Sequence, residues 1–395
     1  MLTRRSFVRT VGIGAAGALT GSFIGARGRE HSLWSAIEPG LQAVEPGVIC
    51  LASNENPLGP GPTVLDAARA AFGPDGSKPG RYAGTAGALI EAIARKLQVK
   101  TENIVLGCGS TQILRSATHL FTAKDRPLVG TIPTYEECAG YAELVQHPVN
   151  GVPLDAEFRM DLDRMADAAR GAGLLFYCNP NNPTATYVGA KATREFIARV
   201  NRESPETTIL VDEAYYDYVT DPDHDTHIPI AVENPRVLVA RTFSKAYGMA
   251  GLRIGYAVGH RDTIRRMEEW DGGSGGSSLN VIAMHAAIAA IERPAAELAA
   301  ERERNRVVRD LTMKWFADRG MKPAASQANF MFVNVGRPVR QFREACRGKR
   351  ILVARDFPPF EKTHCRISFG TMEEMKAAFA IFTDVLGSPA TAEAA

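Results

Sequence analysis

Three short apolar segments, each followed at once by polar or turn-forming residues, place the strongest constraint on the fold of this 395-residue chain. Their residue ranges are 174–178, 209–211 and 235–243. The polar side chains that follow them, Asn182, Asp212 and Lys245, lie about thirty residues apart. Continuous apolar runs are typical of strands that are buried on both faces of a parallel sheet. Because ligand groups collect at the carboxyl ends of such strands, we expect the three side chains to form one site.

The segment 242–253 supplies a lysine suited to covalent chemistry together with two candidate phosphate ligands. Lys245 follows a predicted strand in a loop of small residues, which can hold an amine away from bulk water so that it deprotonates readily. Ser244 could donate a hydroxyl hydrogen bond, and Arg253 a guanidinium pair, to one phosphate. Taken alone, a Ser-Lys pair is usually a solvated surface pair.

The other two polar segments also have simpler structural interpretations. The loop 179–184 is rich in turn residues and could be only a tight turn. An aspartate that ends a strand, as Asp212 does, is often a helix cap. The order of the three polar groups along neighbouring predicted strands favours one shared site.

Eight ordered motifs between about Leu51 and Thr371 carry a family resemblance. They are Asn54–Pro57, Arg81–Tyr82, Gly107–Thr111, Pro133–Tyr135, Asn179–Thr184, Asp212–Tyr215, Phe243–Arg253 and Arg366–Gly370. Through these motifs the chain resembles the fold-type I pyridoxal phosphate enzymes, and among them the histidinol-phosphate aminotransferases. The resemblance implies an α/β fold with a large domain, built on a mostly parallel seven-stranded sheet, and a smaller α+β C-terminal domain.

The resemblance implies the cofactor pyridoxal 5'-phosphate and a catalytic set of Lys245, Asp212 and Tyr215. Lys245 would form the Schiff base and move the proton, and Asp212 would keep the pyridine nitrogen protonated. Asn182 and Tyr215 would hydrogen-bond the phenolic oxygen, and Tyr135 would stack on the ring. The implied phosphate ligands are Ser110 and Thr111 at the start of a predicted helix, Ser244, Arg253 and the partner subunit's Tyr82.

The implied substrate ligands follow the same pattern. Arg366 would bind the substrate α-carboxylate through two hydrogen bonds, and Asn56 would also contact the substrate. Arg355 is a candidate for a distal anionic or polar group, although a surface ion pair with Asp356 is an alternative interpretation. Because Tyr82 would come from the partner, the resemblance implies an obligate homodimer with shared active sites.

The implied reaction moves an amino group between an L-amino acid and a 2-oxo acid or related carbonyl. The same lysine, aspartate and arginine also serve decarboxylases, racemases, lyases and oxidases on this fold, so these chemistries stay open. A binding protein without activity is disfavoured because every inferred catalytic position is filled.

Two segments depart from the family pattern. Ala185 stands where the family usually has glycine, so the backbone there must manage without free access to positive φ. A Gly/Ser-rich run at 272–278 replaces a bulkier segment near the substrate entrance, and it could be a mobile loop or a surface linker. The identity of the substrate therefore should not be copied from the family.

The amino terminus resembles a twin-arginine export signal. Arg4 and Arg5 precede a weakly apolar run at 11–25, and this route carries folded proteins that have already bound a cofactor. The predicted location is therefore periplasmic or otherwise exported, with the twin-arginine export machinery as a partner. A disordered basic arm is the alternative interpretation.

The charge balance supports treating residues 1–26 separately. They carry three arginines and no acidic residue, and without them 43 basic residues remain against 44 acidic ones. A near-neutral chain predicts no nucleic-acid partner and no binding to an anionic membrane, and no later run is apolar enough for stable membrane insertion. The predicted division of the rest is 27–74 for an arm and part of the small domain, 75–285 for the large domain and 286–395 for the small domain.

Metal and disulfide chemistry are not predicted. The six cysteines have no paired metal-ligand spacing, and we expect Cys108 and Cys178 to be small buried thiols. His224 and His227 lie in an acidic loop that could bind a metal, but such a loop is usually just solvated.

Overall fold

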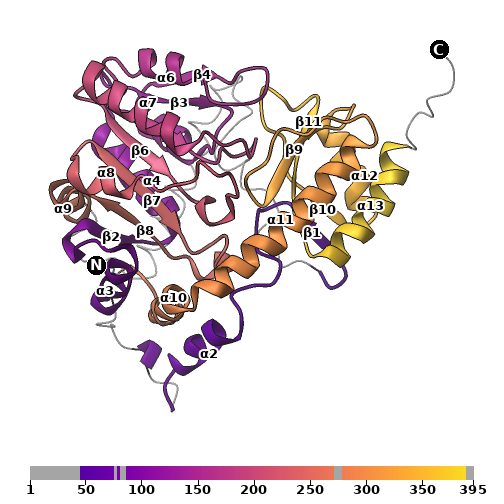
Figure 1. Cartoon of the computed structure of the whole chain (residues 1–395), viewed down its shortest axis with the longest axis horizontal. Helices are drawn as coiled ribbons and strands as arrows, with labels where there is room; N and C mark the ends of the chain where they lie inside the picture. The colour runs from indigo at the N-terminus through magenta and orange to yellow at the C-terminus, as the bar shows by residue number, and fades with distance from the viewer. Residues whose placement is uncertain (1–44, 75–77, 81–85, 271–277, 388–395) are drawn as a thin grey trace, which may run out of the picture. The chain divides into compact units, whose positions relative to one another are not determined.

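The computed structural model describes residues 45–74, 78–80, 86–270 and 278–387, which belong to one compact unit. Its centre is a seven-stranded sheet with the order β2-β8-β7-β6-β5-β3-β4 (Figure 1). The strands are β2 (Ile104–Gly107), β3 (Leu128–Ile132), β4 (Val149–Pro153), β5 (Leu174–Cys178), β6 (Thr208–Asp212), β7 (Val237–Thr242) and β8 (Gly255–Gly259). Only the pairings of β8 with β2 and β7 are antiparallel, so the predicted mostly parallel seven-stranded sheet is confirmed.

The two faces of this sheet are covered by different helices. Side chains alternate along each strand, so that Leu175 and Ile209 belong to one buried cluster while Leu174 and Leu210 belong to another. The first cluster includes residues of α2 (Pro62–Ala70), α3 (Ala86–Leu97), α6 (Leu162–Ala168), α7 (Ala190–Glu203), α8 (Ile228–Glu233) and α10 (Val281–Glu292). The second includes residues of α4 (Gly109–Phe121), α5 (Glu137–Leu144) and α9 (Arg261–Trp270).

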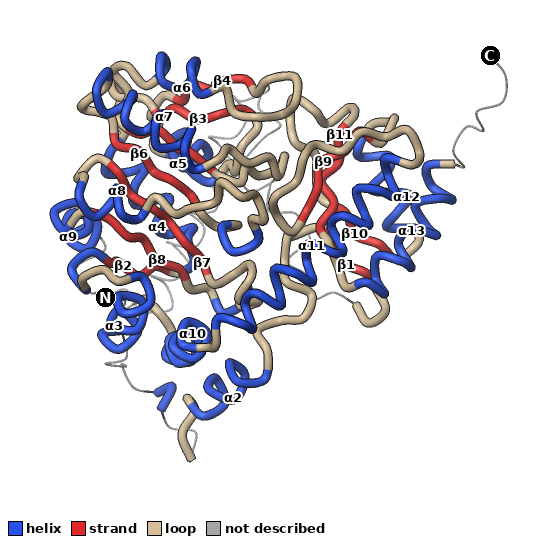
Figure 2. The backbone as a smooth tube through the Cα atoms, in the orientation of Figure 1, coloured by secondary structure: helices blue, strands red, loops and turns tan. Residues whose placement is uncertain are grey.

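A separate buried cluster joins the start of the described chain to its C-terminal part. The parallel pair β1 (Ile49–Leu51) and β10 (Ile351–Val353) and the antiparallel pair β9 (Phe330–Asn334) and β11 (His364–Ser368) provide its strands (Figure 2). Its helices are α11 (Ala295–Ala317), α12 (Val339–Gly348) and α13 (Met372–Leu386). Pro294 separates α10 from α11, because a proline disfavours the helical conformation of the residue before it.

Short 3-10 helices connect several of these elements. They are η2 (Lys78–Gly80), η3 (Thr101–Asn103), η4 (Tyr216–Tyr218) and η5 (Ala250–Leu252). Among the described residues, no helix is both long and apolar enough to cross a membrane.

The predicted elements around the site form, with small shifts at their ends. The three apolar segments are β5, β6 and β7, and the helix that Ser110 and Thr111 were expected to begin is α4. Cys178 is buried as expected, but Cys108 is exposed because it precedes the first turn of α4. The domain boundaries at 74 and 285 stay predictions. The export signal at 1–26, Tyr82 and residues 272–277 of the Gly/Ser run lie outside the described residues.

Candidate active site

The carboxyl ends of β5, β6 and β7 bring the predicted polar groups together. The strand register pairs Cys178 with Asp212 and Asp212 with Ala240, so these three strands end side by side. Asn182 follows β5, Asp212 is the last residue of β6, and Lys245 follows β7. The three residues therefore follow neighbouring strands at the same edge of the sheet, and their function as one site stays a prediction.

Asp212 is buried with little compensation for its charge. Burial raises the pKa of the Asp212 carboxyl to about 7, against the lowering effects of a hydrogen bond from the backbone N–H of Ala214 (3.1 Å) and of the Lys245 charge. The Cys178 thiol lies 3.9 Å from the other carboxylate oxygen. A carboxylate in this state is stabilised by any cationic group that binds beside it.

Lys245 has an amine that loses its proton easily. Burial and the nearby Arg366 guanidinium lower the pKa of Lys245 to about 8. The Lys245 Nζ donates a hydrogen bond to the carbonyl oxygen of Ser53 (3.2 Å) and lies 5.7 Å from the centre of the Tyr215 ring. A large fraction of this amine is therefore neutral, and nucleophilic, in mildly alkaline solution.

Tyr215 is held by Asn54, a residue to which the sequence interpretation gave no role. The Asn54 Nδ2 donates to the Tyr215 hydroxyl (3.0 Å), and the Asn54 Oδ1 accepts from Ser368 Oγ (2.8 Å). Because the Tyr215 hydroxyl oxygen accepts the hydrogen bond from Asn54, its O–H group remains available to donate another hydrogen bond. The sequence marks Asn54 only as the first residue of the motif Asn54–Pro57, in which Asn56 is the predicted substrate ligand.

Three of the predicted phosphate ligands, Thr111, Ser244 and Arg253, converge on one cradle at the amino end of α4. The Arg253 guanidinium lies 3.4 Å from Ser244 Oγ and 3.4 Å from Thr111 Oγ1. A Cβ at Gly109 would lie 2.4 Å from Arg253 Nη2, so a side chain would fill the cradle. Backbone N–H groups of the first turn, Ser110 among them, add positive potential.

Tyr135 lies at the edge of the same cradle. Its pKa is raised to about 12, first by burial and then by the charge of Glu137, and a hydrogen bond with Thr111 opposes the change. The Tyr135 phenol is therefore neutral and lies beside the candidate phosphate site, and its stacking on the cofactor ring stays a prediction.

Arg366 is a buried cation that the C-terminal part of the chain supplies to the site. Its Nη1 donates to Asn182 Oδ1 (2.7 Å), and its Nε is buried without a hydrogen-bond partner in the described part of the chain. Burial lowers the pKa of Arg366 to about 10. A buried guanidinium with an unused donor fits an anionic ligand such as a carboxylate.

The remaining two predicted substrate ligands make contacts that the sequence did not indicate. Arg355 forms an ion pair with Glu136 and donates to the backbone carbonyl of Asp356 (2.9 Å). Asn56 Nδ2 donates to the carbonyl of Ala246 (3.2 Å), so it braces the loop that carries Lys245. The substrate roles of Arg355 and Asn56 stay predictions.

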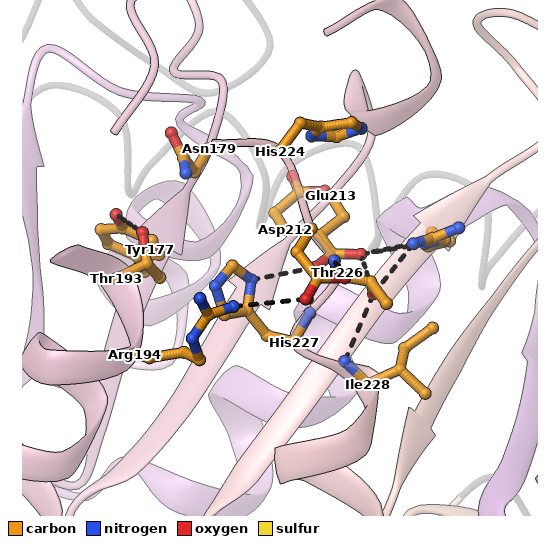
Figure 3. Close-up of polar contacts among 12 residues, drawn as sticks. Tyr177, Asn179, Thr193, Arg194, Asp212, Glu213, His224, Thr226, His227 and Ile228 are labelled. Atoms are coloured by element: carbon orange, nitrogen blue, oxygen red, sulfur yellow. Dashed lines mark hydrogen bonds and ion pairs between the residues drawn. The ribbon is translucent and has the colours of Figure 1, made fainter. Parts of the chain in front are cut away.

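A buried ionic network lies directly behind Asp212, and the sequence interpretation missed it. Glu213 accepts hydrogen bonds from Thr226 Oγ1 (2.9 Å) and from the backbone N–H of His227 (2.8 Å), residues that Figure 3 labels. Glu213 also accepts a hydrogen bond from Arg241 Nη2 (2.7 Å). Burial opposes the charge of Glu213, but Arg241 and His227 outweigh it and lower the pKa of Glu213 to about 2. This network ties the end of β6 to β7.

The histidines that were considered as metal ligands have other contacts. His227 Nδ1 lies 3.1 Å from Glu213 Oε1, and the His224 ring packs on Tyr216 with the centres 4.2 Å apart. Within the described residues, no group of three or more acidic, histidine or cysteine side chains could hold a metal ion.

Ala185 has a positive φ, although the sequence led us to expect a backbone without free access to that region. It adopts φ of +61°, the left-handed conformation that glycine would take without strain. Its N–H donates to Asn181 O (2.7 Å), and its carbonyl accepts from Gln327 N (2.9 Å). These two hydrogen bonds hold the loop in that conformation despite the methyl group.

Comparisons with known proteins agree with this geometry. The family model for aminotransferase class I and II matches residues 46–382. Histidinol-phosphate aminotransferase of Moorella thermoacetica is 34% identical over 350 residues, which cover 86% of this chain and 86% of that protein. The crystal structure of histidinol-phosphate aminotransferase from Sinorhizobium meliloti in complex with pyridoxal-5'-phosphate has a TM-score of 0.78 at 28% identity, covering 87% of this chain and 92% of that one. A tetra mutant of Thermus thermophilus aspartate aminotransferase, 24% identical, shares the fold with a TM-score of 0.75, covering 87% of this chain and 98% of that one. The chain belongs to the aminotransferase class I and II family.

Proposed function

We propose that this protein is a pyridoxal phosphate-dependent aminotransferase that moves an amino group between an L-amino acid and a 2-oxo acid or related carbonyl. The observation that carries the proposal is the pairing of two groups with opposite pKa shifts at neighbouring strand ends. Asp212 is a buried carboxylate that lacks a strong cationic partner, and Lys245 is an amine with a lowered pKa. Membership of the aminotransferase family supports the same conclusion.

The residues fit the cofactor at both of its ends. Asp212 would accept a hydrogen bond from the protonated ring nitrogen, which would relieve its buried charge. Arg253, Ser244 and Thr111 would hold the phosphate in the cradle that Gly109 leaves open. When bound, pyridoxal phosphate supplies an aldehyde for the amine and a ring that draws electrons from the substrate Cα.

The protein groups around this site would do the remaining work. Lys245 would take the proton from the substrate Cα and deliver it to the C4′ atom of the cofactor. The Tyr215 hydroxyl, which accepts a hydrogen bond from Asn54, would donate a hydrogen bond to the phenolic oxygen of the cofactor. Arg366 would bind the α-carboxylate, and its Nε, which has no hydrogen-bond partner among the described residues, is available to donate to it.

Oligomeric state and location form part of the proposal. We infer an obligate homodimer in which the partner's Tyr82 completes the phosphate site. We also infer export through the twin-arginine route, with the signal at residues 1–26. Replacing Arg4 and Arg5 together by lysine should keep the protein in the cytoplasm, and cell fractionation would measure it. Export at the wild-type level would remove the support for this location.

Titration of the purified holoenzyme with L-amino acids under anaerobic conditions tests the proposed reaction. Loss of the visible absorption band, with release of the matching 2-oxo acid, is the expected result. Release of carbon dioxide or a racemised amino acid would instead assign a different carbanion chemistry. As a control, Lys245→Ala should abolish turnover while the dimer persists in gel filtration. Turnover by that variant at the wild-type rate would refute the role of Lys245.

A further inference from the structure

We propose that Glu136 is a specificity-determining residue that neutralises Arg355 at the distal end of the substrate site. The enzyme would then favour amino donors with an uncharged distal group over donors with a distal carboxylate or phosphate. This inference deepens the proposed aminotransferase function and rests on it. It starts from the ion pair between Glu136 and Arg355, which is formed by residues 219 positions apart in the chain.

The pair lies beside the groups that are expected to hold the substrate. Glu136 directly follows Tyr135, the candidate stacking residue, and Arg355 lies shortly after β10. The guanidinium carbons of Arg355 and Arg366 lie 4.5 Å and 4.9 Å from the centre of the same ring, that of Phe357. The charge of Arg355 also contributes to the lowered pKa of Arg366. Arg355 is therefore one aromatic ring away from the proposed α-carboxylate ligand.

Two cations so close would ordinarily suit a substrate with two anionic groups. The Glu136 carboxylate changes this balance, because a distal anion approaching Arg355 must displace Glu136 or bind next to a like charge. A distal amide, hydroxyl or ring meets no such repulsion. The side chains of Arg355 and Glu136 are 27% and 46% exposed, so the carboxylate can move. A movable, partly solvated charge should shift selectivity rather than block anions, and we expect an effect on the order of tenfold.

The chain provides a matched control one residue further on. Glu137 pairs with Arg115 of α4 at 2.5 Å, so Glu137→Gln removes the same charge from the same segment without touching Arg355. Glu136→Gln keeps the size of the side chain and removes the charge that faces Arg355. Comparing the two variants separates the effect of the charge next to Arg355 from the effect of removing one negative charge anywhere in this segment.

Binding of two non-reacting carboxylates to the holoenzyme tests the inference without turnover. Succinate carries two carboxylates, and succinamate has an amide in place of one of them. Dissociation constants follow from the change in visible absorption on titration. We expect the wild type to bind succinamate more tightly, and Glu136→Gln to shift the ratio toward succinate by about tenfold, with Glu137→Gln shifting it less than about threefold. A wild-type preference for succinate, or equal shifts in the two variants, would overturn the inference.

Matched amino donors provide the second readout. In single-turnover measurements, the ratio of kcat/KM for glutamine over glutamate, and for L-histidinol over its phosphate, should exceed one in the wild type. Both ratios should fall in Glu136→Gln. If no amine reacts while the succinamate preference and its dependence on Glu136 persist, the aminotransferase proposal fails and the charge inference stands. If oxo acids are released but the kcat/KM ratios are the same in the wild type and Glu136→Gln, the charge inference alone fails.

Discussion

Asp212→Asn should stabilise the cofactor-free protein while it abolishes efficient catalysis. In the free protein the Asp212 carboxylate is buried, and burial raises its pKa from 3.8 to about 7. Asparagine has the same shape, carries no charge and can still accept the hydrogen bond from Ala214 N–H. The buried charge of Asp212 destabilises the folded protein, but the cofactor needs it, so removing the charge should raise stability and lower activity.

The size of the stability gain in Asp212→Asn, and its dependence on pH, follow from the difference between the folded and unfolded pKa of Asp212. The folded pKa of Asp212 lies above the unfolded value, so the folded protein holds an extra proton between about pH 4 and pH 7. The stability contribution therefore falls as pH rises through this window, and the full cost is present above pH 7. Raising the pKa of the Asp212 carboxyl from 3.8 to about 7 corresponds to about 4 kcal/mol. The new amide would face the Cys178 thiol rather than a good acceptor, which costs about 2 kcal/mol at every pH. We therefore expect a net gain of about 2 kcal/mol at pH 8 and a net loss of about 1–2 kcal/mol near pH 4.

Urea unfolding of the cofactor-free wild type and Asp212→Asn at pH 5 and pH 8 measures this difference. All samples should have one protein concentration, because the stability of a dimer depends on it. Added pyridoxal phosphate should raise the unfolding midpoint of the wild type more than that of the variant, since only the carboxylate pairs with the ring nitrogen. The reasoning is refuted if the free variant is less stable than the wild type at pH 8, or if the difference does not grow between pH 5 and pH 8.

Three further substitutions or conditions test other parts of the site. Arg241→Met leaves Glu213 buried without its cation and should lower the free energy of unfolding by about 3–5 kcal/mol; adding Glu213→Gln should recover part of this loss in urea unfolding, and no recovery would contradict the ion-pair explanation. Gly109→Ala places a Cβ 2.4 Å from Arg253 Nη2, at a φ of +68°, and should weaken cofactor binding by about tenfold or more in fluorescence titration; unchanged affinity would mean that the phosphate binds elsewhere. The rate at which the cofactor-free protein develops visible absorption with pyridoxal phosphate should rise with pH and level off above about pH 8, where Lys245 is neutral; a rise that continues to pH 10 would show an unshifted lysine.

The elements that carry the site were predictable because their signals are local. Strands β5, β6 and β7 are short apolar runs, and Asn182, Asp212 and Lys245 follow them within a few residues. Side-chain alternation and strand order then require these polar groups to meet at one edge of the sheet. The helix start at Ser110 is likewise a local feature, and the structure places it as expected.

The partners of these groups were not predictable in the same way. Asn54 and Tyr215 are 161 residues apart, and no local pattern states that their side chains meet. The ion pair that the sequence offered as an alternative for Arg355 was with its neighbour Asp356, whereas the ion pair forms with Glu136. Cys108 was expected to be buried but is exposed, because the chain turns into α4 there.

The sequence by itself determined the family, the central sheet and the residues that end its strands, because hydrophobic runs and motif order are properties of the chain alone. Tertiary structure decided the electrostatic state of the site. The burial that raises the pKa of Asp212, the pairing of Glu136 with Arg355 and the left-handed backbone at Ala185 all depend on segments that are distant in sequence. Charge compensation and desolvation are set by everything that packs around a group, and that environment exists only once the chain has folded.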